Sequence, residues 1–311
     1  MKKILIIGSN GQLGSELLTV LRKKYGSKNV ISSDINAPSN KDAFFEKIDS
    51  RELSNLISIV EKYEIKHIYH LAAILSANGE LNPILLWEIN MKTLLNVLEL
   101  GRKGIIERIF WPSSIAVFGR DTPKDYTDQN AIKNPSTAYG ISKLAGEKWC
   151  QYYFEKFGVD VRSIRYPGLI SHKVQPGGGT TDYAIDIFFK AVSGRSYDCF
   201  LHKDTSLPMM YIDDAVKGAL MLMEAPSEKL SIRSSYNLNA TSFSPAELTA
   251  EIKKHIDDLQ VQYNPDYRQL IAESWPRSVD DRSARTDWGW KEDFGLPQIT
   301  SEMISALRMK K

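Results

Sequence analysis

The sequence predicts an α/β fold, in which a doubly wound parallel sheet is followed by a smaller C-terminal lobe. Three observations support this prediction. Short β-rich runs alternate with longer helical patterns through the first half, a glycine-rich turn follows the first run, and the rhythm breaks after Tyr166. Alternation of this kind is typical of a parallel sheet with helices on both faces.

Five apolar runs carry the strand signal in the first half. They lie at Ile4–Ile7, Asn29–Asp34, His67–Ala73, Arg108–Ser114 and Asp160–Tyr166, with helical patterns between them near residues 12–24, 51–63, 83–101 and 137–157. Parallel strands need such crossover connections, so their carboxyl ends meet at one edge of the sheet. Open α/β sheets bind their ligands at that edge.

The stretch "GSNGQLG" places Gly8, Gly11 and Gly14 between the first strand and the first helix. Glycines allow a tight turn with close backbone approach, and the helix N-terminus offers N–H groups to a pyrophosphate. Asp34 ends the second strand about 20 residues on, where a carboxylate can hold ribose hydroxyls and repel a 2′-phosphate. This context favours NAD over NADP. The alternative is an ordinary glycine-rich turn with Asp34 as a solvated strand end.

The second half has a different pattern. The segment 167–183, "PGLISHKVQPGGGTTDY", is rich in Gly and Pro and predicts a long loop of a kind that is usually functional. Residues 209–224 predict a strand end running into a helix, residues 235–240 a strand, and Ser244 with Glu247 a capping box. We expect an NAD-binding Rossmann domain in 1–166, to which 208–240 return, and a substrate-binding lobe in 167–207 and 241–311.

Composition restricts the classes of partner. Of the 311 residues, 42% are hydrophobic and 25% are charged, and the formal net charge of +2 gives no electrostatic footprint for nucleic acid or an anionic membrane. No stretch approaches the ~20 apolar residues that span a bilayer. Cys150 and Cys199 are too few for a disulfide framework and lack zinc-ligand spacing. We expect a soluble cytoplasmic protein with no metal, nucleic-acid or membrane partner.

Tyr139 and Lys143, in "STAYGISKLAGEKW", lie four positions apart and so share one face of the predicted helix. A lysine ammonium there can lower the pKa of the tyrosine from about 10 toward working pH. The tyrosine then accepts a proton from a substrate hydroxyl while a hydride leaves the same carbon. The pair by itself favours an ordinary structural contact, since this spacing is common on helices.

These motifs resemble the extended branch of the short-chain dehydrogenase/reductase superfamily. The resemblance rests on the GxxGxxG spacing, "HLAA", Asn90 in its helix, "WPSSIAVFG", the Tyr139/Lys143 pair and "RYPGLIS". It implies catalysis by Tyr139, Lys143, Ser114 and Asn90, with Ser114 hydrogen-bonded to the reacting oxygen and Asn90 relaying protons through water. It implies an NAD site formed by Gly8, Asn10, Gly11, Gln12, Leu13, Gly14, Asp34, Asp49, Ser50, Leu71, Ala72, Ala73, Asn90, Tyr139, Lys143, Tyr166 and Leu169. The alternatives are that Ser114 is an ordinary strand-end cap and that Asn90 bonds a nearby loop.

The substrate is expected to be small. Nucleotide-sugar enzymes of this superfamily typically have "RYFN" after the fifth strand, whereas Pro167 and Gly168 stand there in this chain. The second half, with "PGGGTTDYAIDIF", "LPMMYIDDA" and "WPRSVDDRSARTDWGW", is similar to the UDP-galactose epimerase-like L-threonine 3-dehydrogenases. That resemblance implies NAD-dependent oxidation of the L-threonine 3-hydroxyl to 2-amino-3-oxobutanoate, a metal-independent step of threonine catabolism.

Recognition of such an amino acid needs few polar groups. "GGGTT" supplies flexible backbone donors and hydroxyls, and Ser76 lies just past the third strand. The expected substrate-binding residues are Ser76, Ser114, Tyr139, Gly179, Thr180 and Trp275. The alternatives are that "GGGTT" is a mobile surface loop, that the protein is an NAD-dependent nucleotide-sugar epimerase or dehydratase, or that it is a catalytically silent nucleotide-sensing protein.

The resemblance also implies a homodimer. Members of the superfamily usually dimerise through a four-helix bundle, expected here at the helices near 92–103 and 143–157. Leu94, Leu95, Val97 and Leu98 supply apolar side chains for such an interface. A helix that packs on its own core would have the same pattern.

Overall fold

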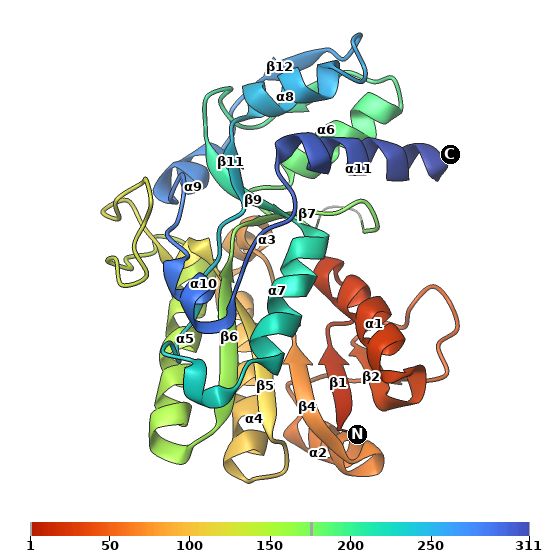
Figure 1. Ribbon diagram of the computed structural model, residues 1–311, viewed down its shortest axis with the longest axis vertical. Coiled ribbons are helices and arrows are strands. Elements are labelled where there is room, and N and C mark those ends of the chain that lie inside the picture. Colours follow the sequence, from red (N-terminus) through yellow and green to blue (C-terminus); the bar gives the residue numbers. More distant parts are fainter. Residues whose placement is uncertain (1, 175–176, 311) are drawn as a thin grey trace.

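A seven-stranded parallel sheet forms the centre of the computed structural model, which describes residues 2–174 and 177–310 (Figure 1). Gln175 and Pro176, within the expected loop, lie outside the described residues. The strands are β1 Lys3–Ile7, β2 Val30–Asp34, β3 Phe45–Lys47, β4 Ile65–His70, β5 Arg108–Ser114, β6 Asp160–Tyr166 and β10 Tyr236–Asn237. Their order is β10-β6-β5-β4-β1-β2-β3, so the chain starts inside the sheet and winds outward in both directions. The predicted doubly wound fold is confirmed.

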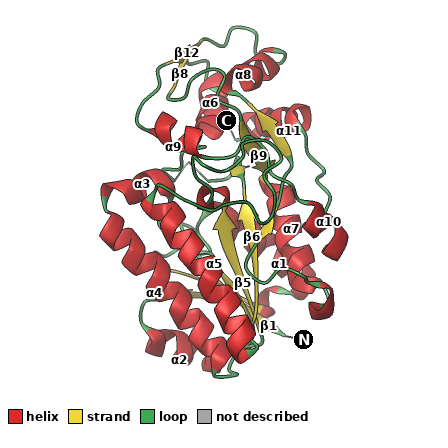
Figure 2. Ribbon diagram, turned by 90° about the vertical axis from the view of Figure 1, so that its left-hand side faces the viewer, coloured by secondary structure: helices red, strands yellow, loops and turns green. Residues whose placement is uncertain are grey.

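Helices cover both faces of this sheet. They are α1 Gln12–Tyr25, α2 Leu53–Tyr63, α4 Pro83–Arg102, α5 Ala138–Phe157 and α7 Ile212–Glu224, with the short α3 Ser76–Leu81 after β4. Figure 2 shows α2, α4 and α5 on one face, and α1 and α7 on the other. Alternate strand residues point to opposite faces, so Leu5 and Ile7 pack toward the first group, and Ile4 and Ile6 toward the second.

Local capping signals set the bounds of the two long helices that follow β4 and β5. α4 begins after Asn82, whose side chain accepts a hydrogen bond in the first turn. α5 begins after Thr137, which caps it in the same way, and ends before Gly158, whose backbone is left-handed. Because α5 starts at the carboxyl edge of the sheet, Tyr139 and Lys143 lie in its first turns at that edge.

The lobe beyond the carboxyl edge contains two small sheets. β7 Gly168–Ile170, β9 Leu207–Tyr211 and β11 Thr241–Phe243 form one, in the order β11-β9-β7, and β8 Tyr197–Cys199 pairs with β12 Val261–Tyr263. Its helices are α6 Tyr183–Val192, α8 Pro245–Lys253, α9 Arg268–Ser274 and α11 Leu296–Met309 (Figure 1). The helix α10 Arg282–Trp288 packs beside β10. The short 3-10 helices η1 Ser27–Asn29, η2 Ile115–Val117 and η3 Ser227–Lys229 lie in connections.

Two sequence predictions need correction at strand ends. The continuous loop expected over 167–183 is wrong at Gly168–Ile170, which forms β7 and pairs in parallel with β9. Three residues are too few for a periodic pattern, so the sequence carries no strand signal there. The strand expected over His67–Ala73 is β4, which ends at His70, so residues 71–75 leave the sheet. The capping box at the start of α8 is confirmed.

Two features of the helices bear on possible partners. Leu94, Val97 and Leu98 of α4 are fully buried in the core between the helices and the sheet, and Leu95 is half-buried. Their apolar pattern is therefore explained by packing within the chain. Among the residues that the structure describes, no helix has the length and apolar character needed to cross a bilayer.

Candidate active site

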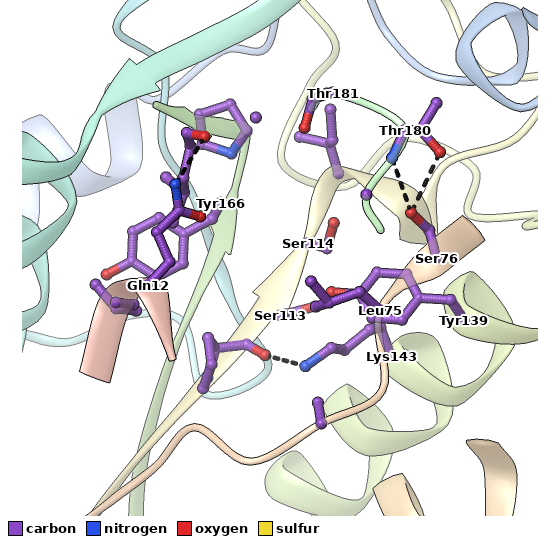
Figure 3. Close-up of a pocket in the computed structure, with 18 of the residues that line it drawn as sticks. Gln12, Leu75, Ser76, Ser113, Ser114, Tyr139, Lys143, Tyr166, Thr180 and Thr181 are labelled. Carbon is purple, nitrogen blue, oxygen red and sulfur yellow. Dashed lines mark hydrogen bonds between the residues drawn. The ribbon is translucent and has the colours of Figure 1, made fainter. Parts of the chain in front are cut away.

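A cavity of about 250 Å³ lies where the carboxyl edge of the main sheet meets the lobe (Figure 3). The ends of β5 and β6, the segments after β1 and β4, the starts of α1 and α5, and residues 179–182 line it. Of the predicted site residues, it brings together Gly8, Gly11, Gln12, Leu13, Gly14, Leu71, Ala73, Ser76, Ser114, Tyr139, Lys143, Tyr166, Leu169, Gly179, Thr180 and Trp275. The glycine turn, the Tyr/Lys pair and the expected substrate groups therefore share one cavity.

A second cavity, of about 310 Å³, adjoins the first at the glycine turn. The two share Gly8, Gly11, Leu71 and Ala73, and the second adds the predicted residues Asp34, Asp49, Ser50 and Ala72. Arg51 also lines it and pairs with Asp49 at 2.6 Å, which holds the pKa of that carboxyl below its ordinary value. Because their linings overlap, the cavities together suit an extended ligand whose middle lies at the glycine turn.

Close backbone contacts shape the glycine turn. A Cβ on Gly14 would lie 2.2 Å from the Gly8 carbonyl oxygen. Gly8 has a φ of +87°, and its Cβ would lie 2.7 Å from the Ala72 nitrogen. These two glycines are therefore required by the backbone of the protein itself.

Gly11 has free space where the other two glycines have none. The nearest atom to a Cβ on Gly11 is the Gly8 carbonyl oxygen at 3.5 Å, an ordinary contact. Gly11 is the residue before α1 and lines both cavities, and it has no side chain that could cap the first N–H groups of the helix. A helix N-terminus presents N–H groups and partial positive charge to an anion. The residues present thus fit the pyrophosphate of a dinucleotide.

Asp34 ends β2 and faces the second cavity. Its Oδ2 accepts a hydrogen bond from the Asn10 backbone N–H at 3.1 Å, and its Oδ1 accepts one from Asn36 at 3.3 Å. Asn10 lines neither cavity, and its side chain donates to the Asn36 carbonyl at 2.7 Å. Asn10 therefore holds the end of β2 against the glycine turn, which orients the Asp34 carboxylate as an acceptor for ligand hydroxyls.

Tyr139 and Lys143 reach from the first turns of α5 to the end of β5, where Ser114 lies (Figure 3). The Lys143 Nζ donates to the Pro112 carbonyl at 2.6 Å and lies 5.6 Å from the centroid of the Tyr139 ring. The Ser114 Oγ accepts a hydrogen bond from the Ala116 N–H at 3.1 Å. Its hydroxyl proton can then be donated into the cavity.

Burial opposes charge on both members of the Tyr/Lys pair. It raises the pKa of Tyr139 to about 12, against the lowering effect of the Ser114 hydroxyl. It lowers the pKa of Lys143 to about 7. Desolvation therefore dominates in the protein alone, and the lowering of the Tyr139 pKa by Lys143 stays a prediction. An anionic Tyr139 requires hydrogen-bond donors or positive charge near its oxygen.

Asn90 lies beside the cavities but lines neither. Its Oδ1 accepts a hydrogen bond from the Ile74 N–H at 2.8 Å, and its Nδ2 donates to the Ile74 carbonyl at 3.2 Å and to Ser142 Oγ at 3.4 Å. Ile74 belongs to the segment 71–75, which lines both cavities. Asn90 thus ties that segment to α5, and its role as a proton relay stays a prediction.

The lobe side of the first cavity carries several polar groups (Figure 3). The Thr180 N–H donates to Ser76 Oγ at 3.3 Å, and the two hydroxyl oxygens lie 3.2 Å apart. Trp275 is 5% exposed, and its Nε1 has no hydrogen-bond partner among the described residues. The Asp182 Oδ2 accepts a hydrogen bond from Gly179 at 2.7 Å, and burial raises the pKa of this carboxyl. A buried donor without a partner is uncommon in proteins, and Trp275 is such a donor in a residue that lines the cavity.

Sequence reasoning missed several lining residues. In the first cavity they are Leu75, Pro112, Ser113, Ile115, Pro167, Gly168, Thr181 and Asp182. Asp182 had a usable signal, since an acid between "GGGTT" and a helix can accept backbone N–H groups. The apolar residues had none, because their place depends on the path of the backbone. Within residues 2–174 and 177–310, no group of three or more His, Cys, Asp or Glu side chains could hold a metal ion.

Comparison with known proteins gives consistent matches. The model of the NAD dependent epimerase/dehydratase family matches residues 4–238. A curated "uncharacterized epimerase/dehydratase" of Staphylococcus haemolyticus is 45% identical over 315 residues, covering 100% of this chain and 99% of that protein. The holo GalE-like L-threonine dehydrogenase from Cupriavidus necator is 52% identical, with a TM-score of 0.96 over 98% of this chain and 99% of that one. A monomeric L-threonine 3-dehydrogenase from a metagenome database, in its apo form, is 49% identical, with a TM-score of 0.96 over 99% of both chains.

The family match extends over most of the chain and includes the strands and helices that line both cavities. The glycine turn and Asp34 independently fit a dinucleotide. The chain therefore belongs to the NAD dependent epimerase/dehydratase family, within the extended short-chain dehydrogenases/reductases, and is an oxidoreductase with NAD as its cofactor.

Proposed function

We propose that this protein is an L-threonine 3-dehydrogenase, which oxidises the 3-hydroxyl of L-threonine to 2-amino-3-oxobutanoate and reduces NAD. The observation that carries the proposal is the buried, unpartnered indole N–H of Trp275 in the same small cavity as Tyr139. The glycine turn of the cofactor site lines this same cavity of about 250 Å³, so the part left for a substrate suits an amino acid better than a nucleotide sugar. The solved relatives named as L-threonine dehydrogenases support the same substrate.

The polar groups of the cavity match the two ends of a zwitterionic amino acid. We assign the substrate carboxylate to the Trp275 N–H and to the hydroxyls of Ser76 and Thr180, which are donors. We assign the substrate ammonium to Asp182, because the Gly179 N–H bonds its Oδ2 and leaves Oδ1 as an acceptor. Thr180 and Asp182 come from the same segment, so one stretch of the lobe contacts both ends of the substrate.

The reaction removes one proton and one hydride from the substrate. Tyr139 accepts the proton of the 3-hydroxyl, and Ser114 donates a hydrogen bond to the same oxygen and holds it beside the phenol. The C3–H bond breaks with its electron pair as the C3–O double bond forms, and bound NAD supplies the acceptor for that hydride. Lys143, fixed by the Pro112 carbonyl, stabilises the anionic form of Tyr139 by its positive charge.

Absorbance of NADH tests the proposal directly. Protein and NAD are mixed separately with L-threonine, L-serine, L-allo-threonine and UDP-sugars, and we expect sustained NADH formation with L-threonine. Replacing Tyr139 by Phe removes only the phenol oxygen, so turnover is expected to fall by about 10²–10⁴-fold. A matched control is Tyr126→Phe, because Tyr126 is 81% exposed and lies outside both cavities. No NADH with L-threonine, or full turnover in Tyr139→Phe, would contradict the proposal.

We also propose that two copies associate through α4 and α5, which lie side by side on one face of the sheet (Figure 2). Apolar side chains are exposed on both helices, with Ile84 and Trp87 on α4, and Ile141, Trp149 and Tyr152 on α5. We therefore expect these exposed residues to form the contact between the two copies, in place of Leu94, Leu95, Val97 and Leu98, which pack within the chain. Light scattering should give twice the mass of the chain, and Trp149→Glu should give the single mass. A single mass for the unaltered protein would contradict the dimer.

A further inference from the structure

A buried ion pair lies behind the cavity. Glu147 of α5 and Arg165 of β6 are each 1% exposed. The Arg165 Nε donates to Glu147 Oε1 at 2.7 Å, and its Nη2 donates to Oε2 at 2.8 Å, so the pair is bidentate. Desolvation cancels most of the attraction in such a pair, and apolar side chains of similar volume give comparable stability. Net stability therefore does not account for these charges, whereas their contacts with the site do.

Glu147 connects α5 to the strand that carries Ser114. It lies one turn beyond Lys143 on the same face of the helix. The Ser113 Oγ donates to Glu147 Oε1 at 2.7 Å, and the Lys143 Nζ donates to the Pro112 carbonyl at 2.6 Å. Two neighbouring residues of β5, immediately before Ser114, are thus held by two neighbouring turns of α5.

Arg165 extends this connection to the next strands. Arg165 and Ser113 are register partners on the parallel strands β6 and β5. The Arg165 Nη1 donates to the Gln129 carbonyl and to Asn237 Oδ1, both at 2.9 Å. The guanidinium therefore bonds α5, β10 and the segment that contains Gln129. With these partners the carboxylate of Glu147 has one orientation.

We propose that Glu147, fixed by Arg165, is a positioning residue that sets the Ser114 hydroxyl against the Tyr139 phenol. This role rests on the proposed acid–base function of those two groups. Ser114 has to reach the substrate oxygen that Tyr139 deprotonates, and small misplacements in such a geometry cost large factors in rate. Without the carboxylate, Ser113 loses its acceptor on α5, and of these two hydrogen bonds only the one from Lys143 to Pro112 still joins the end of β5 to α5.

The charge of Glu147 provides a signature that a purely structural role would not have. The ionisable groups that act on the pKa of Lys143 are Cys150 and Glu147 of its own helix, while Tyr139 lies beside the Lys143 ammonium and His70 of β4 is within reach of its charge. Burial lowers the pKa of Lys143, and the negative charge of Glu147 opposes that shift. Its removal favours loss of protons from Tyr139 and Lys143 alike, so the whole pH profile of kcat should move to lower pH.

Three variants test the proposal. Glu147→Gln keeps the shape and removes the charge, and Ser113→Ala removes only the hydrogen bond that β5 donates to Glu147. Ser163→Ala is the matched control, because Ser163 is a buried residue of β6 whose hydroxyl bonds Ser235 away from the cavity. We expect kcat to fall about tenfold in the first two, with the Kd for NAD within about twofold of the unaltered protein. The pH profile should move to lower pH in Glu147→Gln alone, and Ser163→Ala should change neither quantity.

Unchanged kcat and pH profile in folded Glu147→Gln would overturn the proposal. If that variant does not fold, Ser113→Ala decides, and a kcat equal to that of Ser163→Ala overturns it. Failure of the proposed function is a separate outcome, namely no NADH from L-threonine with the unaltered protein. In that case the ionisation of Tyr139 is followed without any substrate, by tyrosinate absorbance against pH, with Tyr139→Phe identifying the part of the signal that belongs to Tyr139. The pKa measured in this way should be lower in Glu147→Gln than in the unaltered protein.

Discussion

Tyr139 and Lys143 are buried side by side, with the Lys143 Nζ 5.6 Å from the Tyr139 ring centroid, so we expect their ionisations to be coupled. Burial opposes the phenolate and the ammonium separately, as the raised pKa of Tyr139 and the lowered pKa of Lys143 indicate. Attraction favours both charges together, and the pair then titrates as one unit with two apparent pKa values. The active form has lost one proton from the pair, so kcat rises with the first loss and falls with the second.

Replacing Lys143 by Met tests this coupling. The variant leaves Tyr139 with the burial that raises its pKa to about 12 and removes the positive charge that compensates it. We expect kcat near neutral pH to fall by about 10²–10⁴-fold, with activity still rising toward high pH. The measurement is kcat against pH for both proteins. An unmoved rising limb in Lys143→Met would show that Lys143 does not set the ionisation of Tyr139.

His70 links pH to stability through burial. It lies at the end of β4 with its Nε2 3.1 Å from Thr93 Oγ1, and burial lowers its pKa to about 3. Below the ordinary histidine pKa the unfolded chain binds a proton that the folded protein does not, so stability falls as the pH decreases. Between about pH 7.5 and about pH 5 the loss from this group is about 2 kcal/mol. Denaturant unfolding at both pH values should show that loss disappearing in His70→Gln; equal losses in both proteins would contradict it.

At the scale of the element, two glycines of the turn before α1 have different roles, one in the stability of the fold and one in cofactor binding. Gly14→Ala places a Cβ against the Gly8 carbonyl and should lower the free energy of unfolding by about 2 kcal/mol or more. Gly11→Ala meets no clash, because its φ is −71° and the space is open, so it should cost less than about 1 kcal/mol. That same space faces the cavities, and the Kd for NAD should rise about tenfold or more. Denaturant unfolding measures the change in stability, and calorimetric titration measures the Kd for NAD. An unchanged NAD affinity in Gly11→Ala would contradict the assignment of the glycine turn to the cofactor.

The elements differ in how far the sequence could predict them. Most strands and helices of the main sheet were predictable because apolar periodicity and caps are local signals, as in β5 and α5, whereas its three-residue edge strand β3 was not predicted. β7 was not, because three residues carry no period and their pairing with β9 is tertiary. The same distinction holds in the site. Gly11 and the spacing of Tyr139 and Lys143 are visible in the chain, whereas the ion pair behind them joins residues that are 18 positions apart and lie on different elements.

At the scale of the whole molecule, the cavity depends on contacts between distant segments. The loop 119–128 follows η2, and the segment 274–280 carries Trp275 from the lobe. The Lys124 Nζ donates to the Gly119 carbonyl at 3.2 Å and to the Ser274 carbonyl at 2.9 Å, and Thr127 forms a parallel bridge with Val279. Burial lowers the pKa of Lys124. The place of the Trp275 indole relative to Ser114 therefore depends on this loop.

Lys124→Met tests that dependence. It removes the donor shared by the two carbonyls while keeping the length of the side chain, so the segment with Trp275 loses a direct bond to the loop. The glycine turn is not part of these contacts. We therefore expect the KM for L-threonine to rise about tenfold, while the Kd for NAD stays within about twofold.

The matched control for Lys124→Met is Asp125→Asn, at the next residue of the loop. Its ion pair with Arg277 joins the same two segments but is more than half exposed on both sides, and exposed pairs contribute little. Steady-state kinetics with each substrate varied in turn separate the two effects, and Asp125→Asn should match the unaltered protein. A folded Lys124→Met with an unchanged KM would mean that the lobe holds Trp275 by its own packing. The loop would then serve only to cover the edge of the sheet.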